Sequence, residues 1–181
     1  MKIIATAGMP GSGKGEVLEY FKKKKIPSIV MREVVEKQME EKNIEVNNKN
    51  LRNYATGLRD DHGSDIVARM CLPIIESMKG NDIILIDGVR GYDEVKLFKK
   101  ELTDDFILIG VFAPPKQRFE RLCQRGRKWD MKTLEEFEWR DSVELSWGLG
   151  NAIALSDFMV ENTGTLEELH MQLDKILEKI R

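Results

Sequence analysis

The chain has 181 residues, which is enough for one domain with a buried core. Apolar residues make up 41% and charged residues 33%, a composition that excludes an intrinsically disordered chain. The formal net charge of -2 gives no overall attraction to nucleic acid, and no apolar run approaches the ~20 residues that a membrane helix needs.

In the first half of the chain, short apolar runs alternate with segments of helical periodicity. The expected elements, in chain order, are a strand at Lys2–Ala7, a helix at about 13–24, a strand at Ser28–Met31, a helix at 32–42 and a helical block at about 50–78 that breaks near Gly63.

The second half continues the alternation. Residues 83–86 form a continuous apolar run that ends in Asp87, as is typical of a strand buried on both faces of a parallel sheet. Further elements are expected as a strand at 106–112, helices at about 115–123 and 133–145, a strand at 158–161 and a C-terminal helix that begins at the capping-box pair Thr165 and Glu168.

This alternation predicts an α/β fold with a central parallel sheet of about five strands and helices on both faces. Ligands of such sheets bind at the carboxyl ends of the strands. Gly8, Asp87 and Pro114 all fall at those ends.

The segment GMPGSGKGE follows the pattern G-x-x-x-x-G-K between a strand and a helix. Such a loop points its backbone N–H groups around an anion, and the following helix adds the positive end of its dipole. Lys14 adds a full charge for the outer phosphates. The loop therefore predicts a nucleotide site made by Gly8, Met9, Pro10, Gly11, Ser12, Gly13, Lys14, Gly15 and Glu16.

Gly15 stands where many such loops have a Ser or Thr that binds Mg²⁺. We expect the ion to be held mainly by phosphate oxygens and water, because Mg²⁺ readily keeps several waters. Glu16 lies about 100° further around the helix, so it does not simply replace the hydroxyl.

The GKG form of the loop resembles that of adenylate kinases and related nucleoside monophosphate kinases. LIDGVRGYDE is similar to their Asp-Gly-x-x-Arg element, here Asp87, Gly88 and Arg90, and APPKQRFERLCQRGR is similar to their lid entry. SDFMVENTGTLEELHMQL resembles the end of dephospho-coenzyme A kinases. Over nearly its full length, the chain most resembles archaeal proteins described as adenylate-kinase-related or dephospho-coenzyme-A-kinase-like.

This resemblance implies a P-loop NTPase fold of nucleotide-kinase type in a single domain, with an acceptor-side helical insertion at about 32–78 and a short lid at about 125–140. It implies ATP and Mg²⁺ as cofactors and transfer of the γ-phosphoryl group of ATP. The acceptor would be a small nucleotide-like molecule, either a nucleoside monophosphate or dephospho-coenzyme A. A cytoplasmic location is expected, and the oligomeric state is left open.

Four residues are expected to carry the chemistry: Lys14, Asp87, Arg90 and Arg125. Asp87 follows a strand beside the loop, as a carboxylate near the metal does. The resemblance would place Arg90 on the acceptor's phosphate, Arg121 on the donor's adenine and Arg125, or alternatively Arg127, on the donor's phosphates.

For two arginines, Arg118 and Arg140, the sequence leaves both a binding role and an ordinary structural role open. Arg118 shares a helical face with Arg121 and Arg125, but an ordinary solvated face is equally open. Arg140 either forms the far side of the lid or pairs with an acid at helical spacing, Glu136 or Glu144.

The acceptor side carries a weaker signal. Arg32 and Glu33 follow the second predicted strand, and Glu33 is the one obvious acid there for a hydroxyl acceptor. At most one or two of the arginines further on are expected to touch phosphate, the rest balancing nearby aspartates. The residues concerned are Arg52, Arg59 and Arg69, with Leu51, Tyr54 and Leu58 expected in the core.

Two other functions are weighed. Glu36 stands where related kinases have an arginine, which favours a non-catalytic or weakly hydrolytic ATP-binding module. A nucleic-acid end kinase is disfavoured by the net acidic charge. Cys71 and Cys123 lack metal-ligand spacing and are expected as buried thiols in a reducing cytosol.

Overall fold

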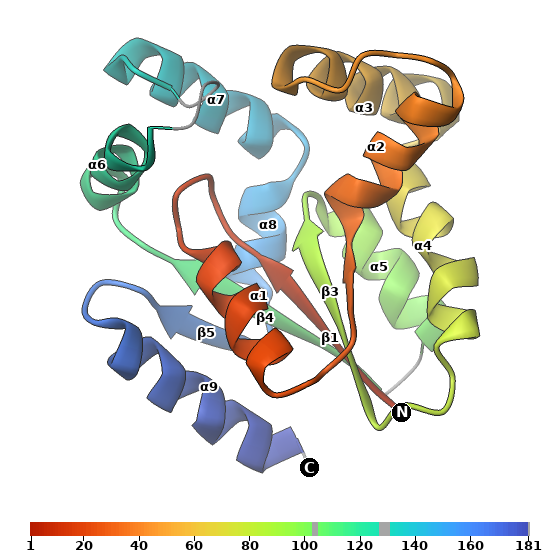
Figure 1. Cartoon of the computed structure of the whole chain (residues 1–181), viewed down its shortest axis with the longest axis vertical. Helices are drawn as coiled ribbons and strands as arrows, with labels where there is room; N and C mark the ends of the chain where they lie inside the picture. Colours follow the sequence, from red (N-terminus) through yellow and green to blue (C-terminus); the bar gives the residue numbers. More distant parts are fainter. Residues whose placement is uncertain (103–104, 127–130, 181) are drawn as a thin grey trace.

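The computed structural model describes residues 1–102, 105–126 and 131–180. Its five-stranded sheet is parallel and has the strand order β2-β3-β1-β4-β5 (Figure 1). The strands are β1 (Lys2–Ala7), β2 (Ser28–Val30), β3 (Ile83–Val89), β4 (Phe106–Phe112) and β5 (Phe158–Glu161). The helices are α1 (Lys14–Lys23), α2 (Met31–Glu41), α3 (Asn48–His62), α4 (Ile66–Ser77), α5 (Tyr92–Leu102), α6 (Pro115–Arg125), α7 (Leu134–Ser146), α8 (Leu149–Ala154) and α9 (Leu166–Ile180).

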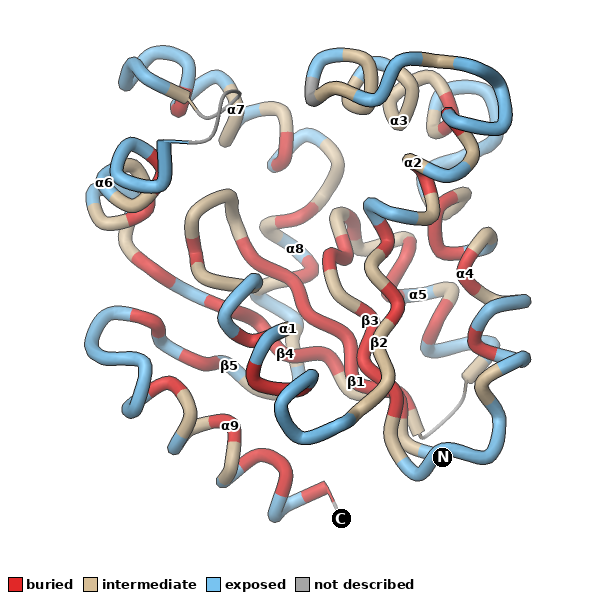
Figure 2. Tube along the Cα trace, viewed as in Figure 1, coloured by how far each residue is buried: buried red, intermediate tan, exposed pale blue. Residues whose placement is uncertain are grey.

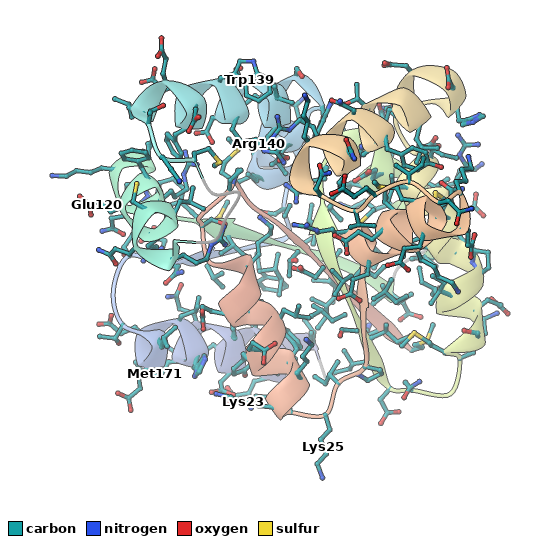
Figure 3. The ribbon with its side chains drawn as sticks, turned by 45° about the horizontal axis from the view of Figure 1, so that its top comes forward. Lys23, Lys25, Glu120, Trp139, Arg140 and Met171 are labelled. Carbon is teal, nitrogen blue, oxygen red and sulfur yellow. The ribbon has the colours of Figure 1, made fainter. Side chains whose placement is uncertain are left out.

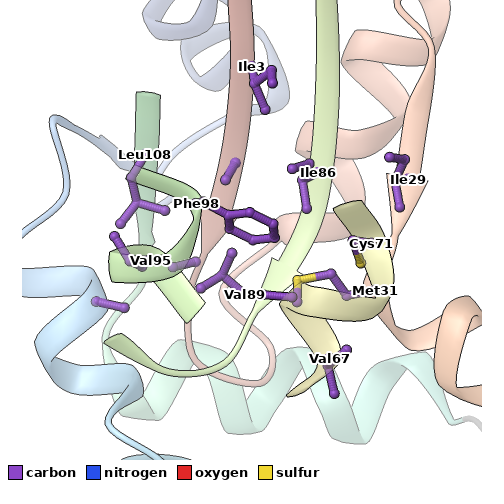
Figure 4. Packing of buried hydrophobic residues seen from close by; sticks show 14 of the residues in the cluster. Ile3, Ile29, Met31, Val67, Cys71, Ile86, Val89, Val95, Phe98 and Leu108 are labelled. Atoms are coloured by element: carbon purple, nitrogen blue, oxygen red, sulfur yellow. The ribbon is translucent and has the colours of Figure 1, made fainter. Parts of the chain in front are cut away.

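Successive side chains of the central strands enter two separate apolar cores, because a strand presents alternate residues to opposite faces. Ile3 and Ala5 of β1 pack with residues of α2, α4, α5 and α8, whereas Ile4 packs with α1 and α9. Figure 4 shows part of the first core, with Phe98 of α5 among side chains from the strands. Helices thus cover both faces, as predicted.

The sheet is the most buried part of the molecule, as the red tube along β1, β3 and β4 shows (Figure 2). Ile3 pairs with Ile84 on one side and with Phe106 on the other. Continuous apolar runs are needed at these strands because both of their faces are covered. No helix in the described part of the chain is both long and apolar enough to cross a membrane.

Most expected elements are confirmed within two residues. The expected block at about 50–78 is α3 and α4, which are separated by Gly63 with a φ of 97°. The sequence analysis assigned no element to α5 or α8. The expectation of two buried thiols is wrong for Cys123, which is exposed on α6, and holds for Cys71.

Candidate active site

The loop between β1 and α1 owes its shape to closely packed glycines. Gly11 and Gly13 have φ angles of 79° and 102°, which side chains other than glycine rarely adopt. A Cβ on Gly11 would lie 2.6 Å from the carbonyl oxygen of Arg118. One on Gly13 would lie 1.9 Å from Nδ2 of Asn162. The two glycines therefore let α6 and the segment after β5 approach the loop directly.

Asn162 ties the loop to the far end of the chain and was missed by the sequence analysis. Its Nδ2 donates a hydrogen bond to the carbonyl oxygen of Ser12 at 2.9 Å. Its own carbonyl oxygen accepts one from Nη2 of Arg121 at 2.7 Å. The available sequence signal was its position directly after the last strand, at the edge where ligands bind.

A cleft of about 890 Å³ opens beside this loop. Most of the predicted nucleotide-binding segment lines it, while Gly8, Met9 and Ser12 are not among its described lining residues. The lining loop residues are Pro10, Gly11, Gly13, Lys14, Gly15 and Glu16. The residues that line the cleft include members of α6 and α7 and members of α2 and α3, two pairs of helices that Figure 1 shows on opposite sides of the loop. This size suits a ligand of nucleotide dimensions.

Lys14 lies in this cleft with its ammonium turned back onto the loop. Nζ donates hydrogen bonds to the carbonyl oxygens of Gly8 at 2.5 Å and Met9 at 3.5 Å. Burial, together with the positive charge of Arg90, lowers the pKa of Lys14 to about 8, against the opposing effect of Asp87. A polyphosphate bound to the loop would stabilise the protonated, charged form of Lys14 and so raise its pKa.

Asp87 lies near the carboxyl end of β3, beside Thr6 of the loop strand, but β3 continues to Val89 and is therefore longer than the predicted run. Its Oδ1 accepts a hydrogen bond from the hydroxyl of buried Thr6 at 2.5 Å, and Thr6 accepts one from the Gly88 amide at 3.3 Å. The carboxylate lines the cleft together with Lys14. Its position beside the loop is therefore fixed by a second strand.

The Asp87 carboxylate suits a magnesium ion that binds together with a nucleotide. Within residues 1–102, 105–126 and 131–180, no cluster of three or more acidic, histidine or cysteine side chains could hold a metal without it. Mg²⁺ is commonly held by one or two carboxylates plus phosphate oxygens and water, and Asp87 supplies such a carboxylate. A Cβ on Gly15 would meet nothing within 4 Å, so packing does not explain the missing hydroxyl.

A buried acid, Glu144 of α7, gathers two arginines at the cleft. Its Oε1 accepts a hydrogen bond from Nη1 of Arg90 at 2.7 Å and another from Nη2 of Arg140. Burial raises the pKa of Glu144, but Arg90, Arg140 and Lys14 outweigh that effect and hold the pKa below its ordinary value. Glu144 is therefore a carboxylate surrounded by cations. Arg140 thus pairs with Glu144, one of the two acids considered for it, and it also lines the cleft.

A second buried acid, Glu94, holds the loop that carries Arg90. Its Oε2 accepts hydrogen bonds from the backbone amides of Arg90 at 2.7 Å and Gly91 at 3.3 Å, and its Oε1 accepts one from Arg59 at 2.9 Å. Burial raises the pKa of Glu94, and Arg59 opposes the rise. Glu94 lies in the first turn of α5, the helix that the sequence analysis missed.

Arg118 of α6 is buried rather than solvated. Its side chain is 4% exposed and forms a fork with the carboxylate of Asp141, with Nη1 at 2.9 Å from Oδ1. Nη1 also donates to the carbonyl oxygen of Pro10 at 3.0 Å. The solvated reading is wrong, because the residue joins α6, α7 and the loop.

The other two basic residues of α6 do reach the cleft. Arg121 lines it, and its Nη1 is buried with no hydrogen-bond partner among the described atoms. Arg125 is exposed and also lines the cleft. Arg127 lies outside the described residues. Arg121 and Arg125 therefore both border the cleft, and their roles belong to the proposal below.

In the segment where acceptor contacts were predicted, Arg32, Arg52 and Arg59 line the cleft. Arg69 instead pairs with Asp65 on α4, as expected for an arginine that balances an aspartate. Glu33 is exposed and is not among the described lining residues. The expected core residues divide. Leu58 is buried, whereas Leu51 and Tyr54 are only partly so, and Leu51 also lines the cleft.

Comparison with known proteins agrees with this geometry. Residues 4–141 match a family model described as an AAA domain. A UPF0200 protein of Methanosarcina acetivorans is 41% identical over 177 residues, which cover 98% of this chain and 94% of that protein. The chain belongs to the UPF0200 family. A UPF0200 protein of Thermococcus onnurineus is 37% identical over 180 residues, covering 98% of this chain and 97% of that protein.

One UPF0200 relative is longer. A UPF0200/UPF0201 protein of Archaeoglobus fulgidus is 40% identical over 181 residues, but the chain spans only 56% of its length. The matched part of that relative covers 99% of this chain.

Solved structures show the fold. TT1252 from Thermus thermophilus matches with a TM-score of 0.69 at 20% identity, covering 99% of this chain and 98% of that one. A gluconokinase from Sinorhizobium meliloti matches at 0.60 and 12% identity, covering 99% and 95%. A shikimate kinase from Aquifex aeolicus matches at 0.55 and 16%, covering 97% and 96%. The UPF0200 chain therefore has a P-loop kinase-like fold. These matches do not single out adenylate or dephospho-coenzyme A kinases.

Proposed function

We propose that this chain is a kinase that transfers the γ-phosphoryl group of ATP to a small nucleotide-like acceptor. The supporting observation is that Lys14 at the start of α1 lines one cleft with Asp87 and Arg90, which lie at the end of β3 and directly after it. Phosphoryl transfer needs little covalent chemistry from the protein and depends on positioning and charge stabilisation. The cleft supplies both.

The residues divide the reaction between them. The loop amides and Lys14 would hold the triphosphate, and Arg90 with Arg125 would stabilise the charge on the transferred group. The bond from the γ-phosphorus to the bridging oxygen breaks, a bond from the γ-phosphorus to an acceptor oxygen forms, and ADP leaves. Arg121 would hold the donor's adenine beside Asn162.

Asp87 would hold Mg²⁺ through its carboxylate or through water. When bound, the ion would neutralise charge on the phosphates. Thr6 keeps the Asp87 carboxylate oriented toward that position through its 2.5 Å hydrogen bond. The hydroxyl missing at Gly15 leaves more of the coordination to phosphate and water.

The two walls of the cleft would serve the two substrates. We propose that residues at about 32–78, which form α2, α3 and α4, bind the acceptor. Residues at about 125–140, of which 127–130 lie outside the described residues, are proposed as a short lid over the donor that excludes water from the transfer. Closed on both sides, the domain would keep water from competing with the acceptor.

The proposed partners are small-molecule nucleotides rather than membranes or nucleic acid, and the proposed location is the cytoplasm, where ATP and Mg²⁺ are available. The finer acceptor choices are a nucleoside monophosphate and dephospho-coenzyme A. The alternative is an ATP-binding module that hydrolyses slowly or not at all.

A transfer assay tests the proposal. The protein is incubated with Mg²⁺, γ-labelled ATP and a panel of monophosphates, nucleosides and dephospho-coenzyme A. We expect label on one class of acceptor with wild type, none with Lys14→Ala, and full transfer with Arg69→Gln, which removes an equal charge outside the cleft. Release of labelled phosphate whatever is added would instead support the alternative module.

A further inference from the structure

The acceptor's chemical class follows from the arginines on the acceptor side of the cleft, and this inference rests on the proposed function. We propose that the acceptor carries a dianionic phosphate monoester, which binds between Arg52 of α3, Arg90 after β3 and Arg140 of α7. Arg52 and Arg140 are thereby specificity-determining residues, reaching the acceptor from opposite walls of the cleft.

Arg52 is the first line of support. Its guanidinium lies over the ring of Trp139, 4.7 Å from the centroid, so α3 and α7 touch at this point. Its Nε is buried and has no hydrogen-bond partner among the described atoms. A buried donor without a partner costs free energy, which a ligand oxygen could recover. Trp139 and Arg140, which are neighbours in sequence on α7, are labelled in Figure 3.

Charge is the second line of support. The guanidiniums of Arg52, Arg90 and Arg140 share the single carboxylate of Glu144, which ion-pairs with Arg90 and Arg140 and interacts electrostatically with Arg52. Arginine does not deprotonate in proteins, so all three stay charged. Asp87 also interacts electrostatically with Arg90, but it interacts with Lys14 as well, so the three guanidiniums exceed the carboxylate that they share by two positive charges in the described part of the cleft. The neighbouring Arg59 is already paired with Glu94.

A phosphate monoester matches that excess. It carries about -1.5 to -2 charges at pH 7 and offers three acceptor oxygens. Guanidinium forks bind such oxygens in pairs. A neutral polyol or nucleoside would leave both charges unbalanced, and a monocarboxylate would leave one.

The surroundings fit an organic phosphate rather than a free ion. Val35, Leu51, Ala55 and Trp147 also line the cleft on this side. Apolar lining with a few convergent charges is the usual make-up of a small-molecule site. The body of the acceptor would lie against these side chains, with its phosphate turned toward the arginines.

The first experiment asks where a minimal dianion binds. Inorganic phosphate is titrated against the protein and followed by phosphorus NMR line broadening. Because phosphate can also enter the loop, three variants separate the sites. We expect Lys14→Ala to retain phosphate binding at the arginine site. In Arg52→Gln, the affinity of that site for phosphate should be at least tenfold weaker. Arg69→Gln, with the same change of charge outside the cleft, should match wild type.

The second experiment uses nucleotides. With a non-hydrolysable ATP analogue bound, AMP, CMP, GMP and UMP are compared by calorimetry with their parent nucleosides. At least one monophosphate should bind tenfold or more tightly than its nucleoside, and Arg52→Lys, which keeps the charge but loses the fork, should weaken it. Unchanged binding of the ATP analogue shows that each variant is folded.

Each failure has a separate meaning. If nucleosides bind as tightly as monophosphates, or if Arg52→Gln and Arg140→Gln both leave phosphate binding unchanged, the phosphorylated acceptor is wrong even though ATP binds. If the ATP analogue does not bind while phosphate still depends on Arg52, the donor site and hence the proposed kinase function fail instead.

Discussion

Lys14 combines a buried position with a charge that an anion would restore. Its pKa near 8 means that part of the ammonium is deprotonated in the free protein at mildly alkaline pH. A bound triphosphate favours the protonated form and raises that pKa, so ATP affinity should be highest below pH 8 and fall as pH rises through it.

This predicts a measurable pH profile. Calorimetric titrations of ATP between pH 7 and 9.5 should show affinity falling by up to about tenfold per pH unit above pH 8. Arg90→Gln removes a charge that lowers the pKa of Lys14, so its inflection should lie at higher pH. A flat wild-type profile, or the same profile in Lys14→Ala, would contradict the assignment.

Two glycines of the loop should respond in opposite ways to the same substitution. Gly15→Ala adds a Cβ into open space in the first turn of α1, and should stabilise the protein by up to about 1 kcal/mol. Gly13→Ala forces a φ of 102° on alanine and a contact with Asn162, and should destabilise by about 1–2 kcal/mol or more. Thermal unfolding measures both, and equal shifts in the midpoint would argue against this loop geometry.

At the scale of elements, the ion pair of Arg118 with Asp141 holds α6 against α7. Because Asp141→Ala leaves the almost fully buried guanidinium unpaired, it should cost about 3 kcal/mol of unfolding free energy. The double variant Arg118→Met/Asp141→Leu should recover part of this loss, since no unpaired charge remains.

Chemical denaturation measures the effect, and Glu76→Ala is the matched control. It breaks an exposed pair with Lys79, so its cost should stay below about 1 kcal/mol. If Asp141→Ala costs no more than this control, the pair does not hold the two helices together.

Strands were more predictable than helices for a physical reason. β3 and β4 need continuous apolar residues because both of their faces are covered, and that demand is visible in the sequence. α8 has six residues, too few to show a helical period. α5 carries a usable signal in Val95 and Phe98, but the segment around it was interpreted through its kinase-like motif alone.

The residues of the candidate site also differ in how far the sequence predicts their surroundings. Lys14 and Asp87 are fixed by local structure at strand ends, so their neighbourhood could be predicted. The pairing of Arg90 with Glu144 joins residues 54 positions apart, and the contact of Arg52 with Trp139 joins α3 to α7. Those contacts depend on how helices pack in three dimensions, which helical periodicity in one segment does not specify.

At the scale of the whole molecule, the contact between Arg52 and Trp139 spans the two walls of the cleft. An acceptor bound to Arg52 should change the surroundings of Trp139, whose side chain is half exposed. We expect a change in tryptophan fluorescence when AMP is added to the complex with the ATP analogue, a smaller change in Trp139→Phe, and loss of most of the remainder when Trp147, which also lines the cleft, is replaced by Phe as well. An equal change in Trp139→Phe would place the signal elsewhere.

The whole account depends on the loop at Lys14 binding a triphosphate. Calorimetric titration of ATP with Mg²⁺ into the wild-type protein and Lys14→Ala tests this most directly. We predict one site per chain in the wild type and at least tenfold weaker binding in Lys14→Ala, with Arg69→Gln equal to wild type. Absence of binding in the wild type, or equal affinity in Lys14→Ala, would contradict it.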